Sequence, residues 1–392
     1  MTLIEFFDTE MLENILATLI LKPERTILFG KDSRKMEKFV SRISHILKEK
    51  NITTDFSVIS VNANDFYAVR KMLISLCDTY PDCAFDMLGG EETVLVAMGA
   101  VASERNIPLY SIRPRSKTLR NILPQGSAVQ NLFSISLSTS QSVHLFGGTV
   151  TECDTLKNEN AMMKLWDICK KDCGKWNVAT EQLARFIPSA EEEPDFDGVT
   201  VHIPMRLLKE NNISPSYRIN HMLSLLDEMQ THKLVHAKTT GDRKTYTFSS
   251  PDILSFLEKS GNILEYYTLY AVSTLPQITD AVSGAVIDWD NPPDPGDEDD
   301  VKNEIDVLAM SGAIPVFISC KNGCVDSDEL YKLNTVAERF GGAYAKKILV
   351  MTYFDVPDSF IQRAHAMNIR LIRNVHKMTW NEFLKKLEDN IQ

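Results

Sequence analysis

The chain has 392 residues, enough for two or three domains of roughly 100 to 200 residues each. Hydrophobic residues make up 44% and charged residues 24%, a balance that is typical of folded globular proteins and excludes a wholly disordered chain. Acidic residues (53) outnumber Lys and Arg (42), which gives a net charge of −11. This charge excludes a protein that coats nucleic acid by its overall charge, so any nucleic acid must be held at a local basic or metal site.

Membrane insertion and disulfide bonding are not expected. No stretch approaches the roughly 20 apolar residues that cross a bilayer, and residues 1–8 contain acidic side chains and no basic leader, so a cytoplasmic protein is predicted. The sequence has seven cysteines, and its two closest pairs, Cys169/Cys173 and Cys320/Cys324, lie four residues apart. A zinc knuckle has a spacing of three, so reduced thiols are the expectation.

The first 150 residues alternate short apolar runs with amphipathic stretches of 10 to 20 residues. The apolar runs predict strands at 26–30, 56–61, 84–88 and 108–112. This alternation predicts a parallel sheet covered by helices, in which ligands bind at the carboxyl ends of the strands. The loops of interest are therefore 7–10, 30–33 and 88–93, each of which joins a predicted strand to a predicted helix.

Residues 151–255 change to a helical pattern with a break at 190–195. A helix is predicted over 217–230, followed by two strands, 234–238 and 244–248, around a turn at Gly241-Asp242. A helix followed by a hairpin suggests a winged-helix-like module. Such a module either packs and transmits motion as a linker, which is the favoured interpretation, or binds nucleic acid directly.

Residues 256–392 form the third predicted domain. A helix containing 264–267 precedes a meander of three strands at 284–288, 303–310 and 315–322, with a tight turn at 311–313. A helix over 326–340 and strands at 347–352 and 370–373 complete the pattern. The predicted domain boundaries therefore lie near residues 150 and 255.

Charged side chains interrupt the apolar pattern of the meander. Glu304 and Asp306 alternate with Ile305 and Val307, so both carboxylates lie on one face of the strand. The same alternation places Ser319 and Lys321 together on the next strand, and pairing across the turn brings the carboxylates and the ammonium to one end. A buried lysine is costly unless it is paired, so this cluster is either a structural salt bridge or a catalytic group.

A resemblance to a known family emerges from these residues. Glu265 on a helix, Asp306 on the second strand and Lys321 on the third, followed by a helix, look like the PD-(D/E)xK nuclease core. Segments 303–308 and 317–323 are similar to the nuclease half of CRISPR-associated effectors that cyclic oligoadenylate activates. Segment 85–93 resembles the ligand-binding strand and loop of their other half, the Rossmann-like CARF domain. The resemblance covers nearly the whole chain in the right order.

This resemblance implies an α/β protein with three parts: a CARF sensor in residues 1–150, a winged-helix-like linker in 151–255 and a PD-(D/E)xK nuclease in 256–392. It also implies a homodimer that binds cyclic tetra-adenylate across its two-fold axis. Ligand binding would switch on cleavage of RNA, DNA or both with Mn²⁺ or Mg²⁺, in type III CRISPR antiviral defence.

The implied metal site departs from the family pattern at one position. The usual motif has Glu or Asp two residues before the lysine, where this chain has Ser319, a poor metal ligand. Either Glu304 or Asp288 replaces that ligand or the metal binds weakly, and Glu304 is preferred because it shares a face with Asp306. Asp306 is then the central ligand and the backbone carbonyl of Cys320 a further one.

The roles of the other two nuclease residues also follow from the resemblance. Lys321 would activate water or stabilise phosphate charge, and Glu265 would hold an outer ligand or water.

The implied sensor site combines helix N-termini with small residues that permit close approach of phosphates. Its candidates are Thr9, Lys31, Asp32, Ser33, Gly89, Gly90, Glu91 and Thr93, with Arg113 and Arg115 as weaker ones. Glu91 is expected to meet adenine or ribose, because its charge repels phosphate. The alternative function is a ligand-responsive transcription regulator that grips DNA with the module from 206 to 248. Ser319 favours this alternative, because it suggests a degenerate nuclease domain.

Overall fold

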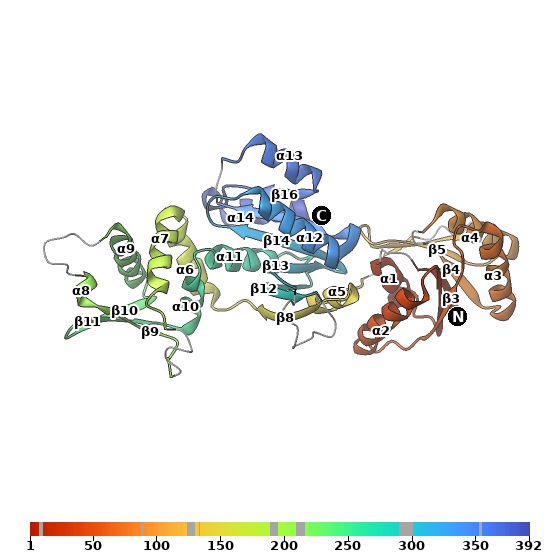
Figure 1. Ribbon diagram of the computed structural model, residues 1–392, viewed down its shortest axis with the longest axis horizontal. Helices are drawn as coiled ribbons and strands as arrows, with labels where there is room; N and C mark the ends of the chain where they lie inside the picture. The colour runs from red at the N-terminus through yellow and green to blue at the C-terminus, as the bar shows by residue number, and fades with distance from the viewer. Residues whose placement is uncertain are drawn as a thin grey trace.

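The structure is a computed structural model that describes residues 1–7, 11–87, 90–123, 130–132, 134–188, 195–208, 216–289, 301–352 and 355–392. It is elongated, with three units side by side along the long axis (Figure 1). The spatial order differs from the chain order: the C-terminal unit, drawn in blue, lies between the N-terminal and central units. The N-terminal and central units therefore both adjoin the C-terminal unit.

The N-terminal unit contains a seven-stranded sheet of order β3-β2-β1-β4-β5-β6-β7, in which the first five strands are parallel and the last two antiparallel. Its elements are β1 (Thr2–Phe6), α1 (Met11–Leu21), β2 (Arg25–Gly30), α2 (Ser33–Glu49), β3 (Asp55–Ser60), α3 (Phe66–Thr79), β4 (Cys83–Asp86), α4 (Glu92–Arg105), β5 (Leu109–Arg113), β6 (Thr118–Leu123) and β7 (Gln130–Leu132). The predicted parallel sheet is confirmed. The strand order reverses between β1 and β4, which is the usual ligand position in such sheets.

The central unit packs helices against a small antiparallel sheet of order β10-β11-β9. Its elements are α6 (Glu159–Cys169), α7 (Cys173–Ala184), β9 (Thr200–Pro204), α8 (Met205–Leu208), α9 (Tyr217–Thr231), β10 (Val235–Thr240), β11 (Arg243–Phe248) and α10 (Pro251–Glu258). The predicted helix and hairpin are confirmed as α9 and β10–β11. Gly241 adopts a φ of +59° in the two-residue turn, a conformation that tight hairpins favour.

The C-terminal unit has a six-stranded mixed sheet of order β16-β15-β14-β13-β12-β8. Its elements are α11 (Asn262–Ser273), β12 (Asp280–Asp288), β13 (Lys302–Ser311), β14 (Ile314–Lys321), α12 (Ser327–Gly341), β15 (Lys346–Met351), α13 (Asp358–Ala366), β16 (Ile369–Ile372) and α14 (Trp380–Ile391), with short 3₁₀ turns at Gly342–Tyr344 and Val375–Lys377. The predicted meander is confirmed. The acidic loop expected between β12 and β13 falls at 290–300, outside the described residues.

Two elements that precede the central unit in the chain join the C-terminal unit. Strand β8 (Thr149–Asp154) pairs with β12 as the edge of the sheet, and α5 (Thr139–Leu145) packs on α12. Thr139 donates hydrogen bonds to Asp280 from both its backbone N–H (2.7 Å) and its hydroxyl (3.0 Å). The chain thus contributes a strand to the C-terminal sheet before it enters the central unit.

Both faces of the C-terminal sheet are buried. Val307 and Ala309 belong to the core that contains α11, whereas Leu308 and Met310 pack with α12. This alternation follows from the period of two in a strand. Helices α11 and α12 therefore cover opposite faces, and a side chain of β13 meets one helix or the other according to its position.

No helix among the described residues is both long and apolar enough to cross a membrane.

Candidate active site

The candidate active site forms where β13 and β14 separate. Their backbone pairing ends at Val307 and Ile318. In the next position, the Asp306 side chain bridges the gap: its Oδ2 accepts a hydrogen bond from Ser319 Oγ (2.9 Å) and one from the Cys320 backbone N–H (2.6 Å). These two bonds fix the carboxylate at the opening between the strands.

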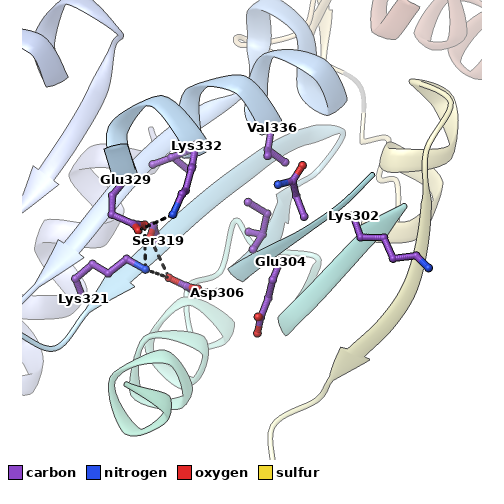
Figure 2. Close-up of a pocket in the computed structure, with 11 residues that line it drawn as sticks. Lys302, Glu304, Asp306, Ser319, Lys321, Glu329, Lys332 and Val336 are labelled. Atoms are coloured by element: carbon purple, nitrogen blue, oxygen red, sulfur yellow. Dashed lines mark hydrogen bonds and ion pairs between the residues drawn. The ribbon is translucent and has the colours of Figure 1, made fainter. Parts of the chain in front are cut away.

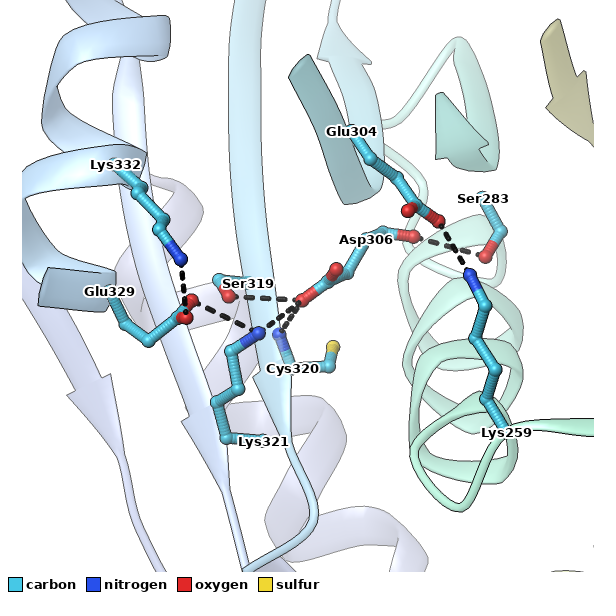
Figure 3. Close-up of polar contacts among 9 residues, drawn as sticks. All are labelled: Lys259, Ser283, Glu304, Asp306, Ser319, Cys320, Lys321, Glu329 and Lys332. Atoms are coloured by element: carbon cyan, nitrogen blue, oxygen red, sulfur yellow. Dashed lines mark hydrogen bonds and ion pairs between the residues drawn. The ribbon is translucent and has the colours of Figure 1, made fainter. Parts of the chain in front are cut away.

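Lys321 lies between two carboxylates (Figure 3). Its Nζ is 3.8 Å from Asp306 Oδ2 and 3.0 Å from Glu329 Oε2. Burial acts to lower the pKa of Lys321, but the charges of Asp306 and Glu329 outweigh this effect and raise it. Lys332 pairs with the other oxygen of Glu329 at 3.4 Å. The predicted approach of Asp306 and Lys321 is present, whereas the position of Glu329 beside them was not predicted from the sequence.

These charged groups line a cavity of about 300 Å³ between β13, β14 and α12 (Figure 2). Most of its lining is polar: Lys302, Asn303, Glu304, Ile305, Asp306, Ser319, Lys321, Glu329, Lys332, Leu333 and Val336. Glu304 and Asp306 share this cavity, as the alternation along the strand predicts. The arrangement offers carboxylates and ammonium groups to a polar ligand of moderate size.

Glu265 lies in a second cavity of about 360 Å³ that adjoins the first through Glu304, which lines both. The separation arises because α11 covers the sheet face opposite to α12. Burial, together with the charges of Asp306 and Glu304, raises the pKa of Glu265 to about 8. Burial also raises the pKa of Asp306 despite the nearby Lys321. Acidic groups therefore converge here at an electrostatic cost, which a bound cation would relieve.

The donor set fits a hard divalent cation. Among the described residues, the hydrogen bonds and the ion pair of the Asp306 carboxylate reach Oδ2, which leaves Oδ1 for a ligand. The carbonyl of Cys320 points to the same side of β14 as its N–H, and hence toward Asp306. Among the described residues, no group of three or more His, Cys, Asp or Glu side chains is placed to hold a metal. A site here would therefore combine carboxylates that exchange their present partners with a carbonyl and waters, the oxygen ligands that Mg²⁺ prefers.

The other predicted metal ligands differ in their position relative to Asp306 and in the partners that they now have. Glu304 is 47% exposed and its Oε1 lies 3.5 Å from Lys259 Nζ, so it must exchange that partner to bind a metal. The Cys320 thiol is buried, and burial with the charges of Asp306 and Glu265 raises its pKa well above the usual value, so it remains neutral. Asp288 is buried at the end of β12 and lines neither cavity.

The predicted sensor residues lie at the carboxyl ends of β2 and β4. Asp32 caps α2, because its Oδ1 accepts a hydrogen bond from the Lys35 backbone N–H (3.1 Å), and Ser33 is the first residue of that helix. Glu91 precedes α4, and Thr93 lies in its first turn. Thr9 and Gly89 lie outside the described residues. The structure thus places the described candidates around two neighbouring helix N-termini.

Lys31 and Glu91 form an ion pair across these two loops. Lys31 and Glu91 were predicted as separate sensor residues, with Glu91 expected to meet adenine or ribose, and their pairing was not predicted. Both side chains are partly exposed, at 49% and 41%, so the pair can open to a ligand. The weaker candidate Arg115 lies over the Tyr344 ring, 5.9 Å from its centre, and thus contacts the C-terminal unit.

Comparisons with known proteins agree with this architecture. Residues 256–389 match the model of a family described as Card1-like, endonuclease domain. Protein VC1899 from Vibrio cholerae has a similar solved structure, with 18% identity and a TM-score of 0.74 over 98% of each chain. Can2 from Sulfobacillus thermosulfidooxidans, solved in complex with cyclic tetra-adenylate, has 16% identity and a TM-score of 0.68, covering 100% of this chain and 99% of that one. No curated protein matches the sequence.

The resemblance stated from the sequence is therefore confirmed. The last third of the chain is similar to the Card1-like endonuclease domain, and the chain shares its α/β fold with Can2 over its whole length. The domain match includes α11, the meander and α12, and hence every residue around the two cavities except those of β8.

Proposed function

We propose that this chain is a metal-dependent nuclease that cyclic oligoadenylate activates in type III CRISPR antiviral defence. The observation that carries the proposal is the meeting of Asp306 and Lys321 at the opening between β13 and β14, inside the segment that matches the Card1-like endonuclease domain. The shared fold with Can2, whose structure contains cyclic tetra-adenylate, supports the N-terminal unit as the sensor and this ring as its ligand.

In the nuclease site, Asp306, the Cys320 carbonyl and Glu304 would hold Mn²⁺ or Mg²⁺. When bound, the cation polarises the scissile phosphate of RNA or DNA as a Lewis acid. Lys321 donates hydrogen bonds to the attacking water or to a phosphate oxygen, and its charge stabilises the negative charge that develops there. Glu265 orients a water from the adjoining cavity through its carboxyl group.

In the sensor, a homodimer would hold cyclic tetra-adenylate between the carboxyl ends of two N-terminal sheets. The N-termini of α2 and α4 offer backbone N–H groups to phosphates, and the Lys31–Glu91 pair would open so that Lys31 meets a phosphate. Binding would reach the nuclease through contacts between the units, such as the bond from Tyr344 Oη to Glu13 and the cation–π contact of Arg115 with the Tyr344 ring.

The alternative function, a transcription regulator, relies on the central unit. Its exposed hairpin carries Lys238 and Arg243, whose charges suit a phosphate backbone. A regulator has no need of an aspartate held by two hydrogen bonds beside a lysine, so the arrangement of Asp306 and Lys321 favours the nuclease.

Incubation of the purified full-length protein with RNA and with DNA, with and without cyclic tetra-adenylate and Mn²⁺, tests the proposal. We expect cleavage only when both the nucleotide and the metal are present. Tight binding of duplex DNA that responds to the nucleotide, without cleavage of either nucleic acid, would support the regulator instead.

A further inference from the structure

Ser319 occupies the position where the nuclease motif usually has a carboxylate. Its hydroxyl donates a hydrogen bond to Asp306 Oδ2 (2.9 Å), and its side chain is largely buried. Ser319 thus acts on Asp306 as a donor and adds no negative charge. The site between β13 and β14 is one carboxylate short of the usual motif on the strand that carries Lys321.

Glu329 places a carboxylate next to this gap from another element. It lies in the first turn of α12, its side chain is 22% exposed, and it lines the same cavity as Asp306 and Ser319. Figure 3 shows its carboxylate pointing toward Ser319 and Lys321. Its Oε2 lies 3.0 Å from Lys321 Nζ, closer than Asp306 Oδ2 at 3.8 Å.

The fold accounts for this position. Only residues 322–326 separate the end of β14 from α12, and Asp326 caps the helix through a bond from the Asp328 backbone N–H (3.0 Å). The first turn of α12 must therefore lie beside the end of β14. Leu330 and Leu333 anchor the helix in the core, which turns Glu329 toward the cavity.

We infer that Glu329 supplies from α12 the carboxylate that position 319 lacks, and binds the divalent cation together with Asp306 and Glu304. The inference rests on the proposed nuclease function and names a residue of that site. Lys321 Nζ lies between Asp306 and Glu329, and Lys332 pairs with the other oxygen of Glu329, so Glu329 must exchange one of these lysines to bind the metal. These carboxylates, the Cys320 carbonyl and waters meet the needs of Mg²⁺ or Mn²⁺.

Glu329 has one competing role, which is to orient Lys321 without touching the metal. The two roles differ in a measurement that needs no nucleic acid. A metal ligand contributes to the affinity for Mn²⁺ alone, whereas a residue that only orients Lys321 contributes to cleavage and leaves that affinity unchanged.

The experiment measures Mn²⁺ binding to the full-length protein by isothermal titration calorimetry, and cleavage with cyclic tetra-adenylate present. Its variants are Glu329→Gln, Ser319→Glu with Glu329→Gln, and Asp328→Asn. Asp328 is the matched control, because it is an exposed acidic residue in the same helical turn. We expect Glu329→Gln to weaken Mn²⁺ binding by at least about tenfold, the scale on which even outer partners of a metal act. The double variant should regain most of that affinity, and Asp328→Asn should bind as wild type does.

Each other result overturns the inference. Wild-type Mn²⁺ affinity in Glu329→Gln would show that this carboxylate does not bind the metal, whether or not cleavage is lost. No gain of affinity in the double variant would show that Glu329 does not replace the missing acid. Asp306→Ala separates this failure from failure of the proposed function: if Asp306→Ala also cleaves as wild type does, the nuclease site itself is misplaced.

Discussion

Asn177 and Asn322 are joined by two hydrogen bonds that link the central unit to the end of β14. Asn177 Nδ2 donates to the Asn322 backbone carbonyl (2.6 Å), and Asn322 Nδ2 donates to Asn177 Oδ1 (2.9 Å). Thr352 Oγ1 donates to Asn322 Oδ1 (3.0 Å) from the end of β15. Asn322 directly follows Lys321, so helix α7 of the central unit holds the strand end that carries the lysine.

We therefore expect Asn177→Ala to slow cleavage by about tenfold, because the loss of two hydrogen bonds at about 0.5–1.5 kcal/mol each frees the end of β14. The effect should fall on kcat more than on KM, since Asn177 lines neither cavity. Steady-state kinetics at saturating nucleotide and metal measure it. Glu181→Ala, at an exposed position of the same helix, is the control. Equal kcat in both variants would show that the central unit does not position Lys321.

Asp306→Ala should abolish cleavage, with a rate loss above about a hundredfold, the scale of a lost electrostatic catalytic group. The affinity for cyclic tetra-adenylate should be unchanged, because the proposed sensor is a separate unit. Initial rates and calorimetric titration of the nucleotide measure the two effects. If Asp306→Ala retains a tenth of the wild-type rate or more, the metal binds elsewhere.

Ser319→Ala and Glu304→Ala should reduce cleavage activity to different extents, with the larger loss in Glu304→Ala. Ser319 donates only one hydrogen bond to Asp306, so its loss should leave most activity. Glu304→Ala should raise the Mn²⁺ concentration that gives half-maximal rate, because we propose that Glu304 contacts the metal. Rate measured against Mn²⁺ concentration distinguishes them. If Ser319→Ala loses more activity than Glu304→Ala, Glu304 does not bind the metal.

Features that depend on local periodicity could be predicted from the sequence. Alternation along 303–307 placed Glu304 and Asp306 on one face, and the turn at 311–313 brought them opposite the strand of Lys321. Features that depend on packing between distant elements were missed. Glu329 is one acidic residue among three at the start of a helix, and only the orientation of α12 selects it. Strand β8 pairs with a strand more than 120 residues away, which no local pattern indicates.

A further prediction concerns Glu5 and Asp86, which are paired neighbours on β1 and β4 and are both buried. Burial raises the pKa of each well above its ordinary value. The charges of Glu5 and Glu13 raise that of Asp86 further, whereas the amide of Asn14 opposes the rise for Glu5. The folded protein therefore keeps these protons at a pH where the unfolded chain has released them.

Protonated Glu5 and Asp86 contribute fully to the free energy of unfolding below the ordinary carboxyl pKa near 4. This contribution is lost as the pH rises toward the pKa values of the folded protein. Each pH unit in that window costs about 1.4 kcal/mol per group. Glu5→Gln should thus raise the Tm at pH 8 and flatten its pH dependence, as measured by calorimetry at pH 5 and pH 8. Glu37→Gln, at an exposed position, should change neither. A lower Tm for Glu5→Gln at pH 8 would show that the Glu5 carboxylate is stabilised by its surroundings.

Gly90 in the proposed sensor has a φ of +112° and lies so close to Phe6 that an added Cβ would be 2.7 Å from Phe6 Cδ1. A side chain there must displace the end of β1 or the loop before α4, both of which we propose to contact the nucleotide. A nucleotide that shifts the enzyme from 1% to 99% active must bind the active state more tightly by about 5.5 kcal/mol. Gly90→Val should therefore weaken nucleotide binding and abolish activation.

Gly99→Val is the matched control for this test, because an added Cβ at Gly99 in α4 meets no described atom within 4 Å. Calorimetry with cyclic tetra-adenylate and cleavage across a range of its concentrations measure binding and activation for both variants. Gly90 precedes α4 of the N-terminal unit, whereas Asp306 and Lys321 lie in the C-terminal unit. Mn²⁺ binding should therefore be the same in Gly90→Val and wild type, which separates a damaged sensor from a misfolded protein. If Gly90→Val binds and activates as Gly99→Val does, the loop before α4 does not contact the nucleotide, and the sensor site lies elsewhere on the N-terminal unit.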